Sequence, residues 1–162
     1  QMEVDHRPER NWSGGIYDEA RRGWLYPVDL NPAAKRAYRW GEWNQYRIEC
    51  IGTTIRTWVN DIPVSYLVDD ASLKGLIGLQ VHAVYEPEDE GKKTYWRNIR
   101  IQTRNLKPRP VDDIPVVNLI PNSLTDLEKK QGFRLLWDGV STRGWRGAFK
   151  PTFPGKGWEI KN

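Results

Sequence analysis

The chain has 162 residues, and its 25 basic and 21 acidic side chains give a formal net charge of +4. The basic side chains are scattered, so we expect no nucleic-acid partner, and no apolar run is long enough to span a bilayer. A single cysteine excludes an intrachain disulfide. Nine tryptophans, seven tyrosines, 14 glycines and 11 prolines favour an all-β domain with many turns.

The first five residues, QMEVD, have the alternation of a strand. Successive side chains of a strand point to opposite faces, so Gln1, Glu3 and Asp5 share one face. An unpaired carboxylate is costly to bury, so this face borders either solvent or a groove. An ordinary solvated face and a ligand-binding face are both compatible with the pattern.

Two segments that follow carry aromatic candidates. Residues 13–18, SGGIYD, combine flexible glycines with Tyr17, which we expect either to contact a sugar or to lie in a turn that feeds a strand. Residues 20–38 lack a regular pattern and predict a long, mobile loop. Trp24 and Tyr26 of this loop are candidates for a wall against a sugar ring.

Residues 41–63 predict an antiparallel hairpin. Apolar and polar side chains alternate through two runs separated by Gly52, and Asn60–Asp61 supplies a polar turn before Pro63. We expect one face to be half-buried and the other to carry large polar and aromatic groups. Cys50 lies within the first run, which favours a buried, unreactive thiol.

Two more strands are predicted, over residues 75–84 and 94–102. Gln80 and His82 share a face of the first strand, where His82 is a candidate acid, base or metal ligand. The alternative for His82 is a hydrogen-bonded structural imidazole. Arg97 shares a face of the second strand with apolar side chains, which indicates an edge position or a buried ion pair.

The second histidine, His6, follows Asp5 directly, but it lies on the opposite face if the strand continues. A carboxylate and imidazole cluster is therefore weakly supported. We predict no metal and no other cofactor, and a divalent metal stays open as an alternative.

Several stretches, in this order, resemble the 3-keto-disaccharide hydrolase family. They are GEWNQYRI from residue 41, the pattern G-x-x-I-x-x-W-x-N after it, GLIGLQVH from residue 75 and WRNIRI from residue 96, preceded by QMEVD and SGGIYD. The resemblance covers residues 1–104. It implies a concanavalin A-like jelly-roll β-sandwich of two curved antiparallel sheets. In this fold a groove runs across the concave sheet.

The resemblance also implies cleavage of 3-keto-glycosides, such as 3-keto-disaccharides. A ketone at C3 acidifies the proton on C2, so a base removes that proton as the C1 substituent leaves, and water adds later. Ordinary glycoside hydrolysis uses two carboxylates and an oxocarbenium-like transition state instead. The family's common form of the first strand places Glu and Gln in the reverse order to that found here.

Eight residues are candidates on this basis, with Glu3 or His82 as the catalytic base. The expected substrate-binding residues are Gln1, Asp5, Tyr17, Trp24, Gln80 and Arg97. Gln80 and Arg97 would hold the ketone sugar, while Tyr17 and Trp24 would pack on its ring. Two alternatives to an enzyme are a non-catalytic carbohydrate-binding module and a structural interaction domain whose aromatic face a neighbouring domain covers.

The rest of the chain predicts a boundary between two domains. Residues 105–131 form a Pro-rich linker, expected as an extended tether with a short helix capped by Asn122 or Ser123. Residues 132–162 resemble the opening strands of the same family. We therefore expect residues 1–104 to be the C-terminal part of a first domain, followed by the start of a second copy, in a fragment of a tandem protein located in the periplasm or outside the cell.

Overall fold

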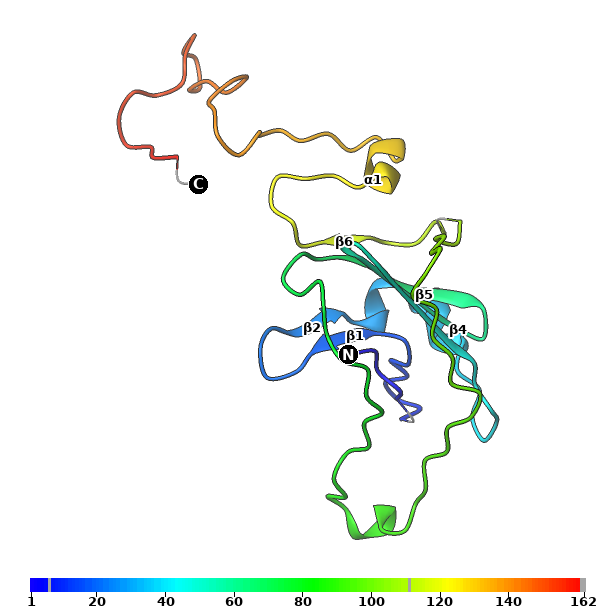
Figure 1. Cartoon of the computed structure of the whole chain (residues 1–162). Helices are drawn as coiled ribbons and strands as arrows, with labels where there is room; N and C mark the ends of the chain where they lie inside the picture. The colour runs from blue at the N-terminus through cyan, green and yellow to red at the C-terminus, as the bar shows by residue number, and fades with distance from the viewer. Residues whose placement is uncertain (6, 111, 161–162) are drawn as a thin grey trace.

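The structure, a computed structural model, describes residues 1–5, 7–110 and 112–160. Its strands form two sheets (Figure 1). One sheet pairs β1 (Ile16–Asp18) with β2 (Gly23–Tyr26), and the other has the order β3 (Tyr46–Ile51), β4 (Thr54–Val59), β5 (Ile62–Val68) and β6 (Val117–Asn118). The remaining elements are the 3-10 turns η1 (Val28–Leu30), η2 (Pro32–Arg36) and η3 (Pro87–Asp89) and the helix α1 (Asp126–Lys130). The predicted all-β fold is confirmed, while the jelly-roll connectivity stays a prediction.

Strands β3, β4 and β5 form an antiparallel meander, which confirms the predicted hairpin. Gly52, with φ of 59°, lies in the turn between β3 and β4. The turn between β4 and β5 is Asn60–Asp61, whose φ angles are 50° and 63°. Two consecutive positive φ values are characteristic of the type I′ turn, whose twist matches that of the flanking strands.

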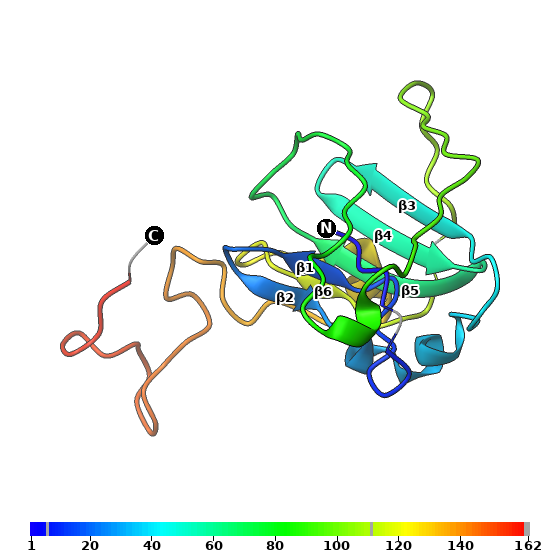
Figure 2. The same cartoon turned by 90° about the horizontal axis from the view of Figure 1, so that it is seen from below.

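The two sheets lie against each other (Figure 2), and the carbonyl oxygen of Gly14, just before β1, accepts hydrogen bonds from both β4 and β5. Thr57 of β4 and Ser65 of β5 donate their hydroxyls to this oxygen at 2.6 and 2.8 Å. Gly14 has φ of 90°, and a Cβ there would lie 3.0 Å from the side chains of Val59 and Val64. The close approach of the sheets therefore requires glycine at this position. We call the face of the meander that carries Thr57 and Ser65 its inner face.

Two apolar clusters form the core, one where η1 and η2 pack on β4 and β5, and one between β1, β2 and β5. The buried members of the first are Val28, Ala34, Ala37, Val59 and Val64, and those of the second are Ile16, Tyr26 and Leu67. Tyr26 is fully buried and donates its hydroxyl to the Pro115 carbonyl at 2.8 Å. The expectation of Tyr26 as a wall against a sugar is wrong, because its ring packs in the core. Residues 20–38 contain β2, η1 and η2 in place of the predicted mobile loop.

Cys50 is exposed, so the expectation of a buried thiol is wrong. It lies on β3, the edge strand of the four-stranded sheet. The apolar clusters on the inner face include residues of β4 and β5, and on β3 they reach Tyr46. The alternation of side chains along β3 was predicted correctly. Alternation alone, however, does not show which strands of a sheet are covered by other elements.

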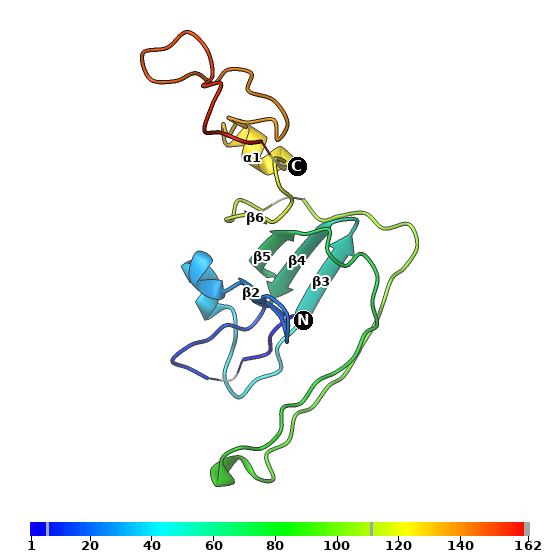
Figure 3. The ribbon, with the colours of Figure 1, turned by 90° about the vertical axis from the view of Figure 1, so that its left-hand side faces the viewer.

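Residues 70–106 form a long excursion that leaves the sheets and returns, with η3 at its far end (Figures 1 and 3). We call this segment the arm. The strands predicted at residues 75–84 and 94–102 are absent, since no described residue of either lies in a ladder. Alternating side chains are not sufficient for a strand, because its backbone groups also need a neighbouring strand. Leu76 and Ile77 of the arm remain exposed.

The described part of the Pro-rich segment after the arm contacts the four-stranded sheet through Arg109 and through β6, and its role as a linker between domains stays a prediction. Within it β6 runs parallel to β5, with Val117 opposite Leu67 and Asn118 opposite Val68. The predicted short helix is present as α1, and its cap is Thr125 and not Asn122 or Ser123. Thr125 and Glu128 form a reciprocal capping box, the arrangement that satisfies two unpaired backbone N–H groups at a helix start.

Residues 132–160 contain no strand in the part of the chain that the structure describes, so the strands expected there are not formed. Phe133, Leu136 and Trp158 are exposed because no second layer covers them. The assignment of this region to a second domain copy stays a prediction. Among the described residues no helix has the length and apolar character needed to cross a membrane.

Candidate functional site

The first five residues lie antiparallel to the segment that leads into β1. Met2 forms an isolated bridge with Ile16, and the Glu3 amide donates to the Gly15 carbonyl at 2.9 Å. The Gly14 amide returns a hydrogen bond of 2.9 Å to the Glu3 carbonyl. This pairing fixes the side chain of Glu3 beside the first sheet, and it explains why polar residues at the chain start and residues on β1 and β2 gather in one place.

Arg10 joins the two carboxylates of this segment. Its Nη2 lies 2.9 Å from Glu3 Oε1, and its Nε lies 2.6 Å from Asp5 Oδ2. The Asp5 side chain is only 1% exposed, whereas those of Glu3 and Arg10 are 20% and 23% exposed. One guanidinium therefore bridges a buried carboxylate and a partly exposed one.

Asp5 is surrounded by donors. Besides Arg10, its carboxylate accepts hydrogen bonds from the backbone N–H groups of Arg7 and Trp12 and from Arg7 Nε. Burial alone would raise the pKa of Asp5, but the hydrogen bonds from Arg10, Trp12 and Arg7 together outweigh burial and lower it. Asp5 is therefore an ionised anchor for Arg10, and its burial leaves no surface for a substrate.

Aromatic rings lie directly against this ion-pair network. Trp24 contacts Trp12 edge-on, with ring centroids 4.6 Å apart, and it contacts Tyr17 at 4.9 Å. The Arg10 guanidinium lies 4.9 Å from the ring centroid of Trp12 and 5.1 Å from that of Trp24. The acid–aromatic cluster, as we name it, consists of Glu3, Asp5, Arg10, Trp12, Tyr17 and Trp24. Four of its six members were predicted from the sequence: Glu3, Asp5, Tyr17 and Trp24.

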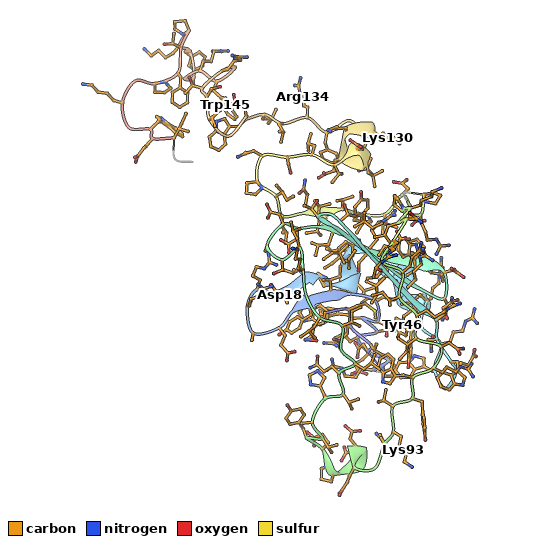
Figure 4. The ribbon with its side chains drawn as sticks, in the orientation of Figure 1. Asp18, Tyr46, Lys93, Lys130, Arg134 and Trp145 are labelled. Atoms are coloured by element: carbon orange, nitrogen blue, oxygen red, sulfur yellow. The ribbon has the colours of Figure 1, made fainter. Side chains whose placement is uncertain are left out.

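A second ion-pair network fixes the end of β1. Asp18, labelled in Figure 4, accepts from Arg22 Nε at 2.7 Å, and the same guanidinium reaches Asp69 at 2.7 Å through Nη2. Asp69 directly follows β5, so Arg22 ties the two sheets together. The cluster is thus built on strands whose relative position is held by both core packing and charge.

Of the other predicted residues, Gln80, His82 and Arg97 lie on the arm, and Gln1 lies at the chain start beside Tyr17. Gln80 donates to Glu19 Oε2 at 3.2 Å, and Gln1 donates to the same oxygen, so Glu19 brings these two amides together. His82 is exposed on the arm. Arg97 lies 3.9 Å from the ring centroid of Trp43. The expected edge-strand position or buried ion pair for Arg97 is therefore wrong, because an exposed cation–π contact takes its place.

Sequence reasoning missed Arg10, Trp12 and Glu19. Arg10 and Trp12 lie in the polar run between the first strand and the glycine pair, where no periodic pattern marks either residue. The only available signal was the presence of arginines near Asp5 in the sequence, because a buried carboxylate requires a cation close to it. Charge pairing of that kind does not reveal which of several nearby arginines is the partner.

Metal ligands are not clustered in the part of the chain that the structure covers. Among residues 1–5, 7–110 and 112–160, no group of three or more His, Cys, Asp or Glu side chains lies in position to hold a metal ion. His6, which the sequence placed next to Asp5, lies outside the described residues.

Comparison with family models gives a match over residues 1–102, to the model described as the 3-keto-alpha-glucoside-1,2-lyase-like domain. The matched stretch contains the whole acid–aromatic cluster and most of the arm. A comparison with curated proteins gives no match.

Proposed function

The chain belongs to the 3-keto-alpha-glucoside-1,2-lyase-like domain family, and on this premise we propose that it cleaves glycosides whose sugar carries a ketone at C3. The observation that supports this proposal best is the position of Glu3. Its carboxylate is partly exposed, is held by Arg10 at 2.9 Å, and belongs to the same cluster as the rings of Tyr17 and Trp24.

The proposed reaction is an elimination across C1 and C2, the bond that the family's name specifies. The C3 ketone acidifies the C2 proton, and a base takes that proton. The electrons of the C2–H bond form a C1–C2 double bond, while the C1–O bond breaks with its pair on the departing oxygen, which then gains a proton. Addition of water to the double bond afterwards completes a net hydrolysis.

Glu3 is our candidate for the base. Its Oε1 accepts from Arg10, and the described residues offer no hydrogen bond to Oε2, so that oxygen is left to accept a proton. Arg10 fixes the orientation of the carboxylate, because a guanidinium also held by Asp5 cannot rotate freely. Tyr17 and Trp24 provide ring faces and edges against which a sugar can pack.

His82, the other base expected from the sequence, lies on the arm and is exposed. No hydrogen bond joins its imidazole to the acid–aromatic cluster among the described residues. Gln80 of the same arm reaches the cluster's edge through Glu19 and Gln1, so it retains a role in holding substrate in this proposal. Arg97 has the weakest support, because its guanidinium stacks on Trp43.

The test is release of 4-nitrophenol from 4-nitrophenyl 3-keto-α-glucoside by the whole chain. Because a positioned base contributes roughly 10²-fold to 10⁴-fold to a rate, Glu3→Gln should lower kcat at least about 100-fold. Glu9→Gln is the matched control, since Glu9 is an exposed glutamate close to Glu3 in sequence. His82→Ala should retain most of the activity. A fully active Glu3→Gln variant, or a loss confined to His82→Ala, would overturn the choice of Glu3.

A carbohydrate-binding module is the second candidate, and the contacting rings of Tyr17 and Trp24 favour it. Aromatic rings bind sugars without any chemistry. Binding of unoxidised glycans by the folded chain, with no product from the ketone substrate, would support this candidate. Its ligand would still contact Tyr17 and Trp24, so Trp24→Ala should weaken binding under either function.

A further inference from the structure

The meander has an outer face, opposite to the one that contacts Gly14. Glu49, Arg56 and Tyr66 are direct partners across β3, β4 and β5. Arg56 precedes Thr57, which donates to Gly14, so by alternation Arg56 and its two partners lie on the outer face. This face is separated by the sheet itself from the side on which the chain start and β1 pack.

Part of the outer face is covered by residues 108–110, which we call the strap. The Arg56 side chain is only 5% exposed, and its Nη2 donates to the Arg109 carbonyl at 2.9 Å. Its Nη1 donates to the Pro110 carbonyl at 3.2 Å. The Arg109 amide in turn donates to Glu49 Oε2 at 3.2 Å, and the Arg109 guanidinium lies 5.3 Å from the ring centroid of Trp58. The strap is therefore held by backbone bonds and by stacking.

The strap and the sheet border a half-open cavity of about 200 Å³. It is lined by Glu49, Ile51, Thr54, Arg56, Tyr66, Pro108 and Arg109. Two apolar side chains, two hydroxyls and two guanidinium groups thus face one small space. Neither Thr54 nor Tyr66 uses its hydroxyl in a hydrogen bond within the described chain, although Tyr66 is 8% exposed.

The residues that line the cavity carry two guanidinium groups and one carboxylate. The only carboxylate of its lining, Glu49, is already occupied at both oxygens. Oε1 accepts from Arg47 at 2.8 Å, and Oε2 accepts from Arg56 at 2.8 Å. Because this carboxylate is paired with Arg47 and Arg56, the Arg109 guanidinium has no acidic partner within the lining. Arg109 has one acidic partner, Asp61, at 3.1 Å, which is exposed at the β4–β5 turn and screened by solvent.

Arg56 also has N–H groups that form no hydrogen bond among the described residues. A guanidinium carries five N–H groups, and Arg56 uses three of them in the bonds to Glu49, Arg109 and Pro110. The other two have no acceptor among the described residues. An occupant that brings oxygen atoms would supply acceptors for them.

We propose that this cavity is a binding site for a small sugar acid, a monosaccharide that carries a carboxylate. The carboxylate binds Arg56 and Arg109, the sugar hydroxyls bind Thr54 and Tyr66, and the ring packs against Ile51 and Pro108. The volume is below the roughly 300 Å³ at which pockets for drug-sized ligands begin, so one sugar residue is the appropriate size. This site is distinct from the acid–aromatic cluster and independent of the proposed elimination.

The experiment is a calorimetric titration of the whole chain with D-glucuronate, D-glucose and acetate at equal ionic strength. Glucuronate should bind at least about tenfold more tightly than glucose, because a charged hydrogen bond adds that much affinity. It should also bind more tightly than acetate, which lacks hydroxyls and a ring. Arg109→Gln should weaken glucuronate binding about tenfold or more and Tyr66→Phe about fivefold. Arg100→Gln, at an exposed position of the arm, should leave it unchanged.

Arg109 also stabilises the strap, so the Tyr66→Phe variant decides the matter if Arg109→Gln does not fold. Three results would overturn the proposal: no glucuronate binding, equal affinity for glucose or acetate, or binding that neither variant weakens. Amide chemical-shift changes at residues 49–56 should accompany binding, and changes confined to residues 1–24 would also overturn it. Because binding and not turnover is measured, the result is independent of whether Glu3 is a base.

Discussion

Arg10 Nε lies 2.6 Å from Asp5 Oδ2, and the carboxylate that it contacts belongs to a side chain only 1% exposed. The same guanidinium reaches Glu3 and lies against the rings of Trp12 and Trp24. Asp5 is thus the fixed point from which the acid–aromatic cluster is positioned. A buried charge of this kind is stable only while its partners remain.

Replacing Asp5 by asparagine should lower the free energy of unfolding by about 3 kcal/mol, the lower end of the range for breaking a buried charge pair. The amide retains the shape of the carboxylate but leaves Arg10 without its counter-charge. Urea unfolding followed by tryptophan fluorescence measures the difference. Asp70→Asn, the same change at an exposed position, should alter stability by less than about 0.5 kcal/mol. Equal stability of the two variants would contradict the anchoring role.

Acid should destabilise the fold through carboxylates whose pKa values are lowered, among them the buried Asp5, Glu49 and Asp69. In Asp69 the hydrogen bond from Arg22 is the main cause, while in Asp5 and Glu49 the arginine and backbone donors outweigh burial, which raises the pKa. A lowered folded pKa contributes stability that is complete above the unfolded value, about 4 for these groups, and is lost as pH falls through the folded value. Tm should therefore be constant from pH 7 to about 5 and fall steeply below about pH 4.

The Asp5→Asn variant provides the internal check for this pH dependence. It lacks one of the carboxylates with a lowered pKa, so its Tm should start lower and fall less between about pH 5 and pH 2. Parallel curves for the variant and the unchanged chain would show that Asp5 does not contribute to the acid transition.

The hairpin was predictable because local chemistry determines it. Gly52 and Asn60–Asp61 are residue types that tolerate positive φ, and alternation on both sides sets the register. The helix α1 was predictable for the same reason, although Thr125 and not Ser123 caps it. The arm shows the limit of such reasoning, since Leu76 and its neighbours have a strand pattern without a backbone partner.

The site residues were predictable where they lie on one strand or on the strand paired with it. Glu3, Tyr17 and Trp24 come together because the chain start pairs beside β1, and β1 pairs with β2. Arg10 was not predictable, since it lies in an irregular turn and its role depends on distances that spacing does not encode. The docking of the strap on Arg56 had no sequence signal, because its bonds go to backbone carbonyls that every residue carries.

Gly14→Ala should destabilise the packing of the two sheets by about 3 kcal/mol, the combined scale of overpacking and backbone strain. The new Cβ would lie 3.0 Å from Val59 and Val64, in a backbone with φ of 90°. Gly75→Ala is the matched control, since nothing lies within 4 Å of a Cβ at Gly75 and its φ is not positive. Thermal unfolding should separate the two variants clearly. A tolerated alanine at Gly14 would mean that the sheets do not meet at this carbonyl.

Arg10→Lys tests whether the guanidinium fork, and not charge alone, positions Glu3. A lysine keeps the positive charge, but a single ammonium lacks the two-sided geometry that reaches Glu3 and Asp5 together. We expect kcat on the 3-keto-glucoside to fall about tenfold, on the scale of one lost charged hydrogen bond, with a smaller change in KM. Arg7→Lys is the control, because Arg7 also contacts Asp5 but has no contact with Glu3 among the described residues. It should weaken stability slightly and leave kcat unchanged. If both variants lowered kcat equally, Arg10 would act through the fold as a whole, whereas a loss specific to Arg10→Lys would identify it as the residue that orients the Glu3 carboxylate.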